Sequence, residues 1–69
     1  MNYYECRTET LAISRAVLKL YKQTLRLGIR DVAEHLLQIL EELARTEPEC
    51  STARDQAYLA IIPYMVSQR

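Results

Sequence analysis

The sequence predicts an all-α protein whose three helices pack as an up-down-up bundle. Hydrophobic residues make up 49% of the 69 residues, with only one glycine and two prolines, which is too apolar for disorder and too poor in turn residues for a many-stranded β fold. Apolar residues recur at helical spacing in three segments, approximately 8–27, 31–46 and 51–66. The short connections between them predict antiparallel neighbours within a single domain, 1–69.

The first helix is expected to span residues 8–27 and to end at Gly28, which takes the left-handed C-cap conformation without a Cβ penalty. Its apolar residues sweep an arc of roughly 200°, whereas a surface helix of a monomeric bundle needs a stripe of about 100°. We therefore expect this helix to contact a second copy of the chain. The expected interface residues are Ile13, Val17, Leu20, Tyr21 and Leu27.

The second helix is expected over residues 31–46. Asp31, with Glu34 three residues later, resembles a capping box. An apolar stripe follows, made of Val32, Leu36, Ile39, Leu40 and Leu43. Pro48 ends the helix, because the residue before a proline is forced out of the helical region.

The third helix is expected over residues 51–66, with Ser51 or Thr52 as its N-cap. Two apolar rows run along it: Tyr58, Ile61, Ile62 and Met65 form the larger, and Ala53, Ala57, Ala60 and Tyr64 form the smaller. Pro63 removes one helical hydrogen bond and clashes with the preceding turn. Because the periodicity continues beyond it, we expect a kink at residues 59–63 and not a stop.

The charges are balanced in number but not in position. Six basic and two acidic residues fall in residues 1–30, and three basic and seven acidic residues fall in 31–69. Four of the cations form a stripe on one line of the first helix: Arg15, Lys19, Lys22 and Arg26. This stripe is either a solvated face, or a face bridged to the acidic second helix, or a contact for nucleic-acid phosphates or an acidic lipid surface. The zero net charge argues against nucleic acid, which stays the alternative.

No arrangement of residues predicts an enzyme, a metal site or a cofactor site. His35 is the only histidine and lies among acidic residues on a helix, without the spacing of a zinc motif. Cys6 and Cys50 are expected at the same end of the bundle, either as two independent thiols or as a disulfide or redox pair. Neither cysteine has a histidine placed to activate it.

Two short segments resemble known families. Leu20-Tyr21-Lys22, followed by Leu25-Arg26, resembles the motif of the LYR mitochondrial assembly factors, which are three-helix proteins; Lys22 replaces their arginine, and their downstream Phe and Arg pattern is missing. Residues 29–36 resemble the first helix of a helix-turn-helix, but Leu37 stands where that motif has its turn glycine. No functional residue is carried over from either family.

The chain shows neither a secretory signal nor an apolar run of the ~18 residues that span a bilayer, so a cytoplasmic location without membrane contact is expected. Together these observations favour a small, non-enzymatic interaction or regulatory adaptor. We expect a homodimer that binds a protein partner through apolar helix faces.

Overall fold

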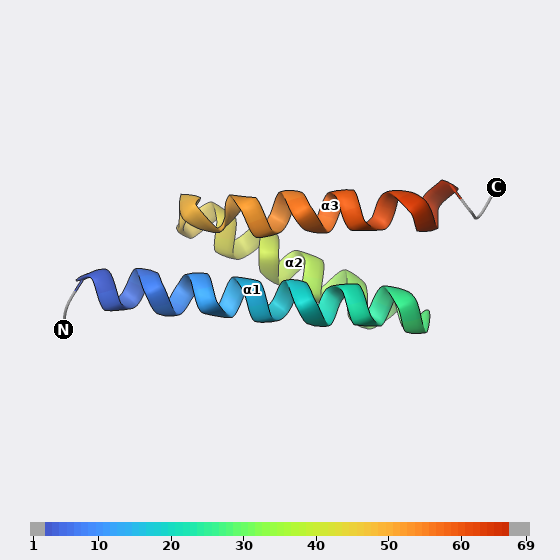
Figure 1. The fold of residues 1–69 in the computed structure, drawn as a ribbon, viewed down its shortest axis with the longest axis horizontal. Coiled ribbons are helices and arrows are strands. Elements are labelled where there is room, and N and C mark those ends of the chain that lie inside the picture. The colour runs from blue at the N-terminus through green and yellow to red at the C-terminus, as the bar shows by residue number, and fades with distance from the viewer. Residues whose placement is uncertain (1–2, 67–69) are drawn as a thin grey trace.

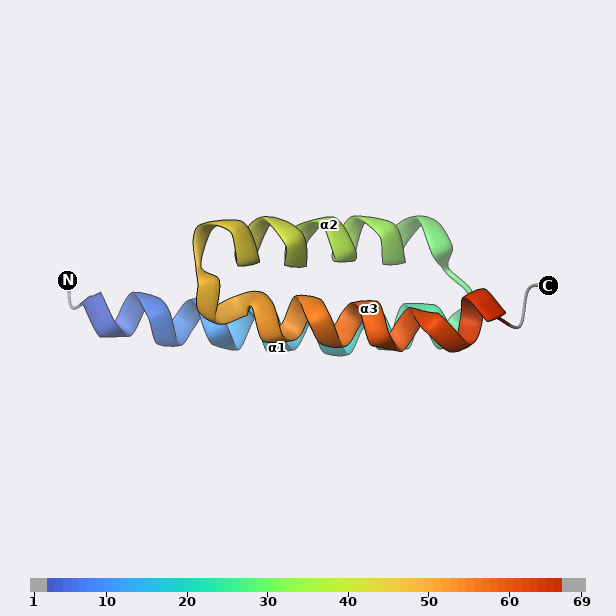
Figure 2. The ribbon, with the colours of Figure 1, turned by 90° about the horizontal axis from the view of Figure 1, so that it is seen from above.

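The computed structural model describes residues 3–66, with side chains from residue 9 onward. Three helices pack against one another: α1 (Tyr3–Leu27), α2 (Arg30–Thr46) and α3 (Ser51–Val66), and a short 3₁₀ turn, η1 (Pro48–Cys50), precedes α3. In Figures 1 and 2, α1 and α3 run side by side in the same direction, and α2 runs back between their ends on one side of the pair. The all-α, up-down-up arrangement of three helices is confirmed.

The first helix begins earlier than the sequence analysis expected. It starts at Tyr3 and not at Thr8, because residues 3–7 contain no glycine or proline that would break a helix. At 25 residues it is longer than α2, which has 17. The blue end of α1 therefore extends beyond the corner between α2 and α3 (Figure 2). That corner lies level with Thr10, whose carbonyl accepts a hydrogen bond from the Cys50 thiol at 3.8 Å.

Gly28 reverses the chain between α1 and α2. Its φ is 78°, in the left-handed region, as its C-cap role predicts. Its N–H donates to the Leu25 carbonyl at 3.2 Å, and the next N–H, of Ile29, donates to the Thr24 carbonyl at 3.0 Å. These two bonds form a Schellman motif, which satisfies carbonyls that the helix end leaves unpaired.

The capping box predicted at Asp31 does not form. The N-cap of α2 is Ile29, with no side-chain hydrogen bond, and the helix starts at Arg30. The two-residue reversal through Gly28 brings the chain into helical geometry before Asp31 is reached. Asp31 instead lies in the first turn, where a carboxylate interacts favourably with the positive end of the helix dipole.

The corner between α2 and α3 is a continuous run of turns. The Glu47 N–H donates to the Leu43 carbonyl at 2.7 Å, and the Cys50 N–H donates back to the Glu47 carbonyl at 2.9 Å. Ser51 already has helical angles, φ −61° and ψ −29°. Neither Ser51 nor Thr52 is therefore the predicted N-cap, because η1 leads directly into α3. The helix then continues through Pro63, and the kink there stays a prediction.

The core contains few large side chains. Its buried cluster is made of Tyr21, Leu25, Ala33, Leu40, Ala53 and Ala57. On α3, the row of small residues faces this core, whereas the larger row is mostly exposed: Tyr58 by 40%, Ile62 by 49% and Met65 by 60%. The alanines allow α3 to approach α1 and α2 closely, and that approach turns the larger row outward.

Candidate functional site

A line of large apolar side chains remains exposed along α1. Ile13, Leu20 and Leu27 are 52%, 50% and 73% exposed, and their spacing of seven residues places them on one side of the helix. Val17, next to this line, is partly buried against the core. Tyr21 is only 1% exposed and belongs to the core, so it is not available to a partner. Three of the five residues expected at an interface are thus well exposed.

Two residues of α2 extend this line into a surface. Val32 and Ile39, also seven residues apart, are 45% and 44% exposed. Glu41 bonds to Tyr58 and therefore marks the edge of α2 that faces α3. Val32 and Ile39 lie on the opposite side of the helix from Glu41, so they are on the edge of α2 away from α3. We call these five residues, Ile13, Leu20, Leu27, Val32 and Ile39, the α1–α2 face. The sequence analysis assigns Val32 and Ile39 to the apolar stripe of this helix and not to an interface; their seven-residue spacing, which matches that of the line on α1, is the signal that could have found them.

A second apolar surface covers the outer side of α3. Its exposed residues are Tyr58, Leu59, Ile62, Met65 and Val66. The Tyr58 hydroxyl donates a 2.6 Å hydrogen bond to a carboxylate oxygen of Glu41. This bond raises the pKa of Tyr58 above its ordinary value of 10.0, because the acidic proton is held by the carboxylate. One edge of the surface is therefore polar and fixed to α2.

The four cations of the basic stripe are not paired with α2. None of Arg15, Lys19, Lys22 and Arg26 takes part in an ion pair or side-chain hydrogen bond with the residues that the structure describes. Lys19, Lys22 and Arg26 instead line a groove between α1 and α3, together with Gln23, Leu25, Ala60 and Tyr64. The stripe is thus a row of free cations beside an apolar floor.

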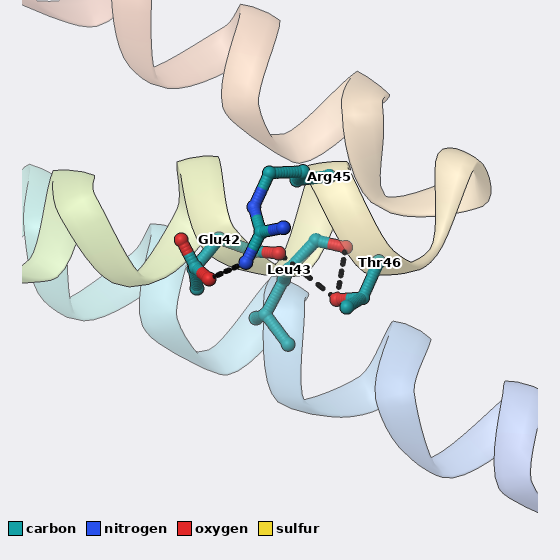
Figure 3. A network of polar contacts seen from close by, with 4 residues as sticks. All are labelled: Glu42, Leu43, Arg45 and Thr46. Carbon is teal, nitrogen blue, oxygen red and sulfur yellow. Dashed lines mark hydrogen bonds and ion pairs between the residues drawn. The ribbon is translucent and has the colours of Figure 1, made fainter.

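Two of the acidic side chains of α2 have polar partners away from the basic stripe: Glu42 within the helix and Glu41 on α3. Arg45 forms an ion pair with Glu42, one turn earlier, and this lowers the pKa of the Glu42 carboxyl. The Thr46 hydroxyl donates to the carbonyls of Glu42 at 2.9 Å and Leu43 at 3.3 Å (Figure 3). The basic stripe lies on the side of α1 that forms a groove with α3, away from these contacts.

The histidine and the buried cysteine of the described residues lie apart, on different elements of the bundle. His35 is exposed, with Gln38, Ile39 and Glu42 as neighbours around a shallow hollow. Among the side chains that the structure describes, residues 9–66, no three His, Cys, Asp or Glu groups lie close enough to hold a metal ion. Cys50 is a buried free thiol, and the side chain of Cys6 lies outside the described residues.

A cavity of about 420 Å³ opens at the Gly28 end of the bundle. Its lining is mainly apolar, with Tyr21, Ala33, Leu37, Ile61 and Met65 among its residues, and Arg30 and Glu34 as its charged groups. The Tyr21 hydroxyl is buried and has no hydrogen-bond partner. Burial, with the nearby Glu41 carboxylate, raises the pKa of Tyr21. The described side chains place no nucleophile and base together in this cavity.

The chain matches no protein-family model, and comparison with curated proteins and with solved structures found no similar protein. No helix in the described part of the chain has the length and apolar character to span a membrane. The geometry of the exposed surfaces is therefore the basis for a functional assignment.

Proposed function

We propose that this chain is a non-enzymatic protein-interaction module that acts as a homodimer, in which the α1–α2 face of one copy packs against the same face of a second copy. The observation that supports this proposal is that Leu20 is 50% exposed and Ile39 is 44% exposed. Each belongs to a line of apolar residues spaced by seven, one line on each of two antiparallel helices. Two such layers related by a twofold axis form a four-helix bundle with a shared apolar seam.

The thin core gives an energetic reason for association. Only Tyr21, Leu40, Cys50 and Ser14 are fully buried among the larger described side chains, and three of the six residues of the core cluster are alanines. A chain of this size gains limited stability from its own core, and many such proteins add oligomerisation. Fully burying a leucine or isoleucine side chain contributes about 1.5–3 kcal/mol, so each half-exposed residue of this face would contribute roughly half of that.

The α1–α2 face suits a second copy better than the outer side of α3 does. The α1–α2 face extends along nearly the whole length of the two helices, from Ile13 to Leu27 on α1. A second copy can therefore pack against two helices at once. The apolar residues of α3 are on a single helix and include Tyr58, whose hydroxyl is already bonded to Glu41. A seam of two helices buries more apolar area than one helix does.

Sedimentation equilibrium at tens of micromolar tests this proposal. We expect a dimer for the natural chain and a monomer for Leu20→Asp and Ile39→Asp, because each places a carboxylate in the seam. Ile62→Asp is the matched control, since Ile62 on α3 is 49% exposed, close to Leu20, and it should remain a dimer. A monomeric natural chain, or dissociation by Ile62→Asp alone, would overturn the proposal.

A further inference from the structure

The groove between α1 and α3 differs from the α1–α2 face, because it combines an apolar floor with a row of cations. It has a volume of about 340 Å³ and is lined from α1 by Lys19, Lys22 and Arg26 and from α3 by Ala60 and Tyr64. No α2 residue lines it, and Figures 1 and 2 show α2 on one side of the α1 and α3 pair. The groove therefore stays open when the α1–α2 face is covered.

The two walls of the groove have different chemistry. The α1 wall carries the basic stripe, which runs from Arg15 to Arg26 over about 16 Å, with a charge at nearly every turn. On α3 the groove is lined by Ala60 and Tyr64. Pro63 and Leu59 lie beside it, about 60° and 100° around the helix from Ala60 on the side away from the core. Both are exposed, Leu59 by 60%. One wall thus attracts anions and the other offers apolar contact.

We propose that this groove binds an amphipathic helix of a partner protein that carries carboxylates along one edge. A helix laid along α1 has the same rise per residue, so carboxylates spaced by three and four residues meet the cations turn by turn. Its apolar residues, at i, i+3, i+4 and i+7, rest on Leu25 and Tyr64. Ala60 has only a methyl group there, which lets the backbone of the partner approach closely.

The apolar half of the groove favours a helix over nucleic acid. Phosphates satisfy the cations equally well, but a duplex has no apolar surface to cover Leu59 and Pro63. The zero net charge of the chain also gives no long-range attraction for a polyanion. This inference rests on the proposed function as a protein-interaction module. It names the class of partner that binds the groove between α1 and α3, which is separate from the dimer interface.

The test is fluorescence anisotropy with a labelled 18-residue helical peptide that has leucines at i, i+3, i+4 and i+7 and glutamates along one edge. We expect saturable binding that weakens as salt rises. The double variant Lys19→Glu with Lys22→Glu should weaken it about tenfold or more. Arg30→Glu with Arg45→Glu changes the net charge equally outside the groove, and should bind the peptide as the natural chain does.

Three further probes distinguish this inference from the alternatives. A peptide of the same composition with its leucines scattered around the helix should bind much more weakly; equal binding would mean that charge alone acts, and would overturn the inference. Tighter, stripe-dependent binding of random duplex DNA, or of vesicles rich in anionic lipid, would overturn it as well. Circular dichroism checks that each variant keeps its helical content.

Sedimentation of the same variants separates this inference from the proposed function. Lys19→Glu with Lys22→Glu should remain a dimer, because neither residue belongs to the α1–α2 face. A dimer that does not bind the peptide contradicts the groove inference alone. A monomer that binds the peptide with the expected charge dependence contradicts the homodimer alone.

Discussion

Tyr58 on α3 and Glu41 on α2 join two helices through a single 2.6 Å hydrogen bond from hydroxyl to carboxylate. The bond crosses the edge of the bundle, where both side chains reach solvent. Within residues 9–66 this bond links the side chains of α2 and α3, and it lies on the side of α3 opposite its buried alanines.

Stability should fall at alkaline pH. The pKa of Tyr58 is raised in the folded chain, chiefly by its bond to Glu41, and burial raises that of Tyr21. A raised pKa contributes stability that is fully present below the ordinary value of 10.0 and is lost as pH rises through the folded-state value. Urea unfolding at a series of pH values above about 10 should show this loss, with a smaller slope in Tyr58→Phe. An unchanged slope in that variant would contradict the role given to the bond.

Gly28→Ala should destabilise the fold through the backbone alone. The φ of Gly28 is +78°, and a Cβ built there meets no atom within 4 Å, so no steric contact adds to the cost. A left-handed conformation costs a non-glycine residue about 1–2 kcal/mol. Urea unfolding should show a loss of that size, and a smaller loss for Gly28→Asn, because asparagine tolerates this conformation better. Equal losses for both would argue against a purely conformational cause.

Ala57→Leu should separate α3 from the other helices. Ala57 is 0% exposed, and adding three carbons to a filled core costs about 1–3 kcal/mol. Gln56→Leu, one residue earlier on the exposed side of α3, is the matched control and should leave the free energy of unfolding nearly unchanged. If the control is the more damaging substitution, α3 faces the core through its other side.

The thiol of Cys50 should be protected from solvent. Its side chain is 1% exposed, and it donates to the Thr10 carbonyl. In a Cys6→Ser variant, Ellman's reagent should modify the remaining thiol only as fast as the chain unfolds, and urea should accelerate the reaction. Immediate reaction in the absence of urea would show that the η1 corner is open.

The helices could be predicted from the sequence because their signals are local. Helical periodicity, Gly28 and Pro48 placed α2 and α3 within one residue of the observed bounds. The N-caps could not be predicted in the same way. Asp31 and Thr52 have the right residue types for caps, but the tight reversal at Gly28 and the 3₁₀ turn bring the backbone into helical geometry before either residue is reached.

The orientation of α3 could not be predicted from its own sequence, because the helix is apolar on nearly every side. Both the larger and the smaller row follow helical periodicity, and periodicity gives no information about how closely a neighbouring helix approaches. Close approach through Ala53 and Ala57 buries backbone as well as side chains, and this outcome depends on α1 and α2. For the same reason, the sequence identified the basic stripe but not the apolar floor beside it.

The odd number of helices has a practical consequence. Tyr3 and Val66, the first and last described residues, lie at opposite ends of a molecule 49 Å long (Figure 1). Circular permutation would therefore require a linker that runs the length of the bundle, whereas a tandem fusion of two copies needs only a short one. Energy transfer between labels at the two ends would report on the end-to-end length of the chain.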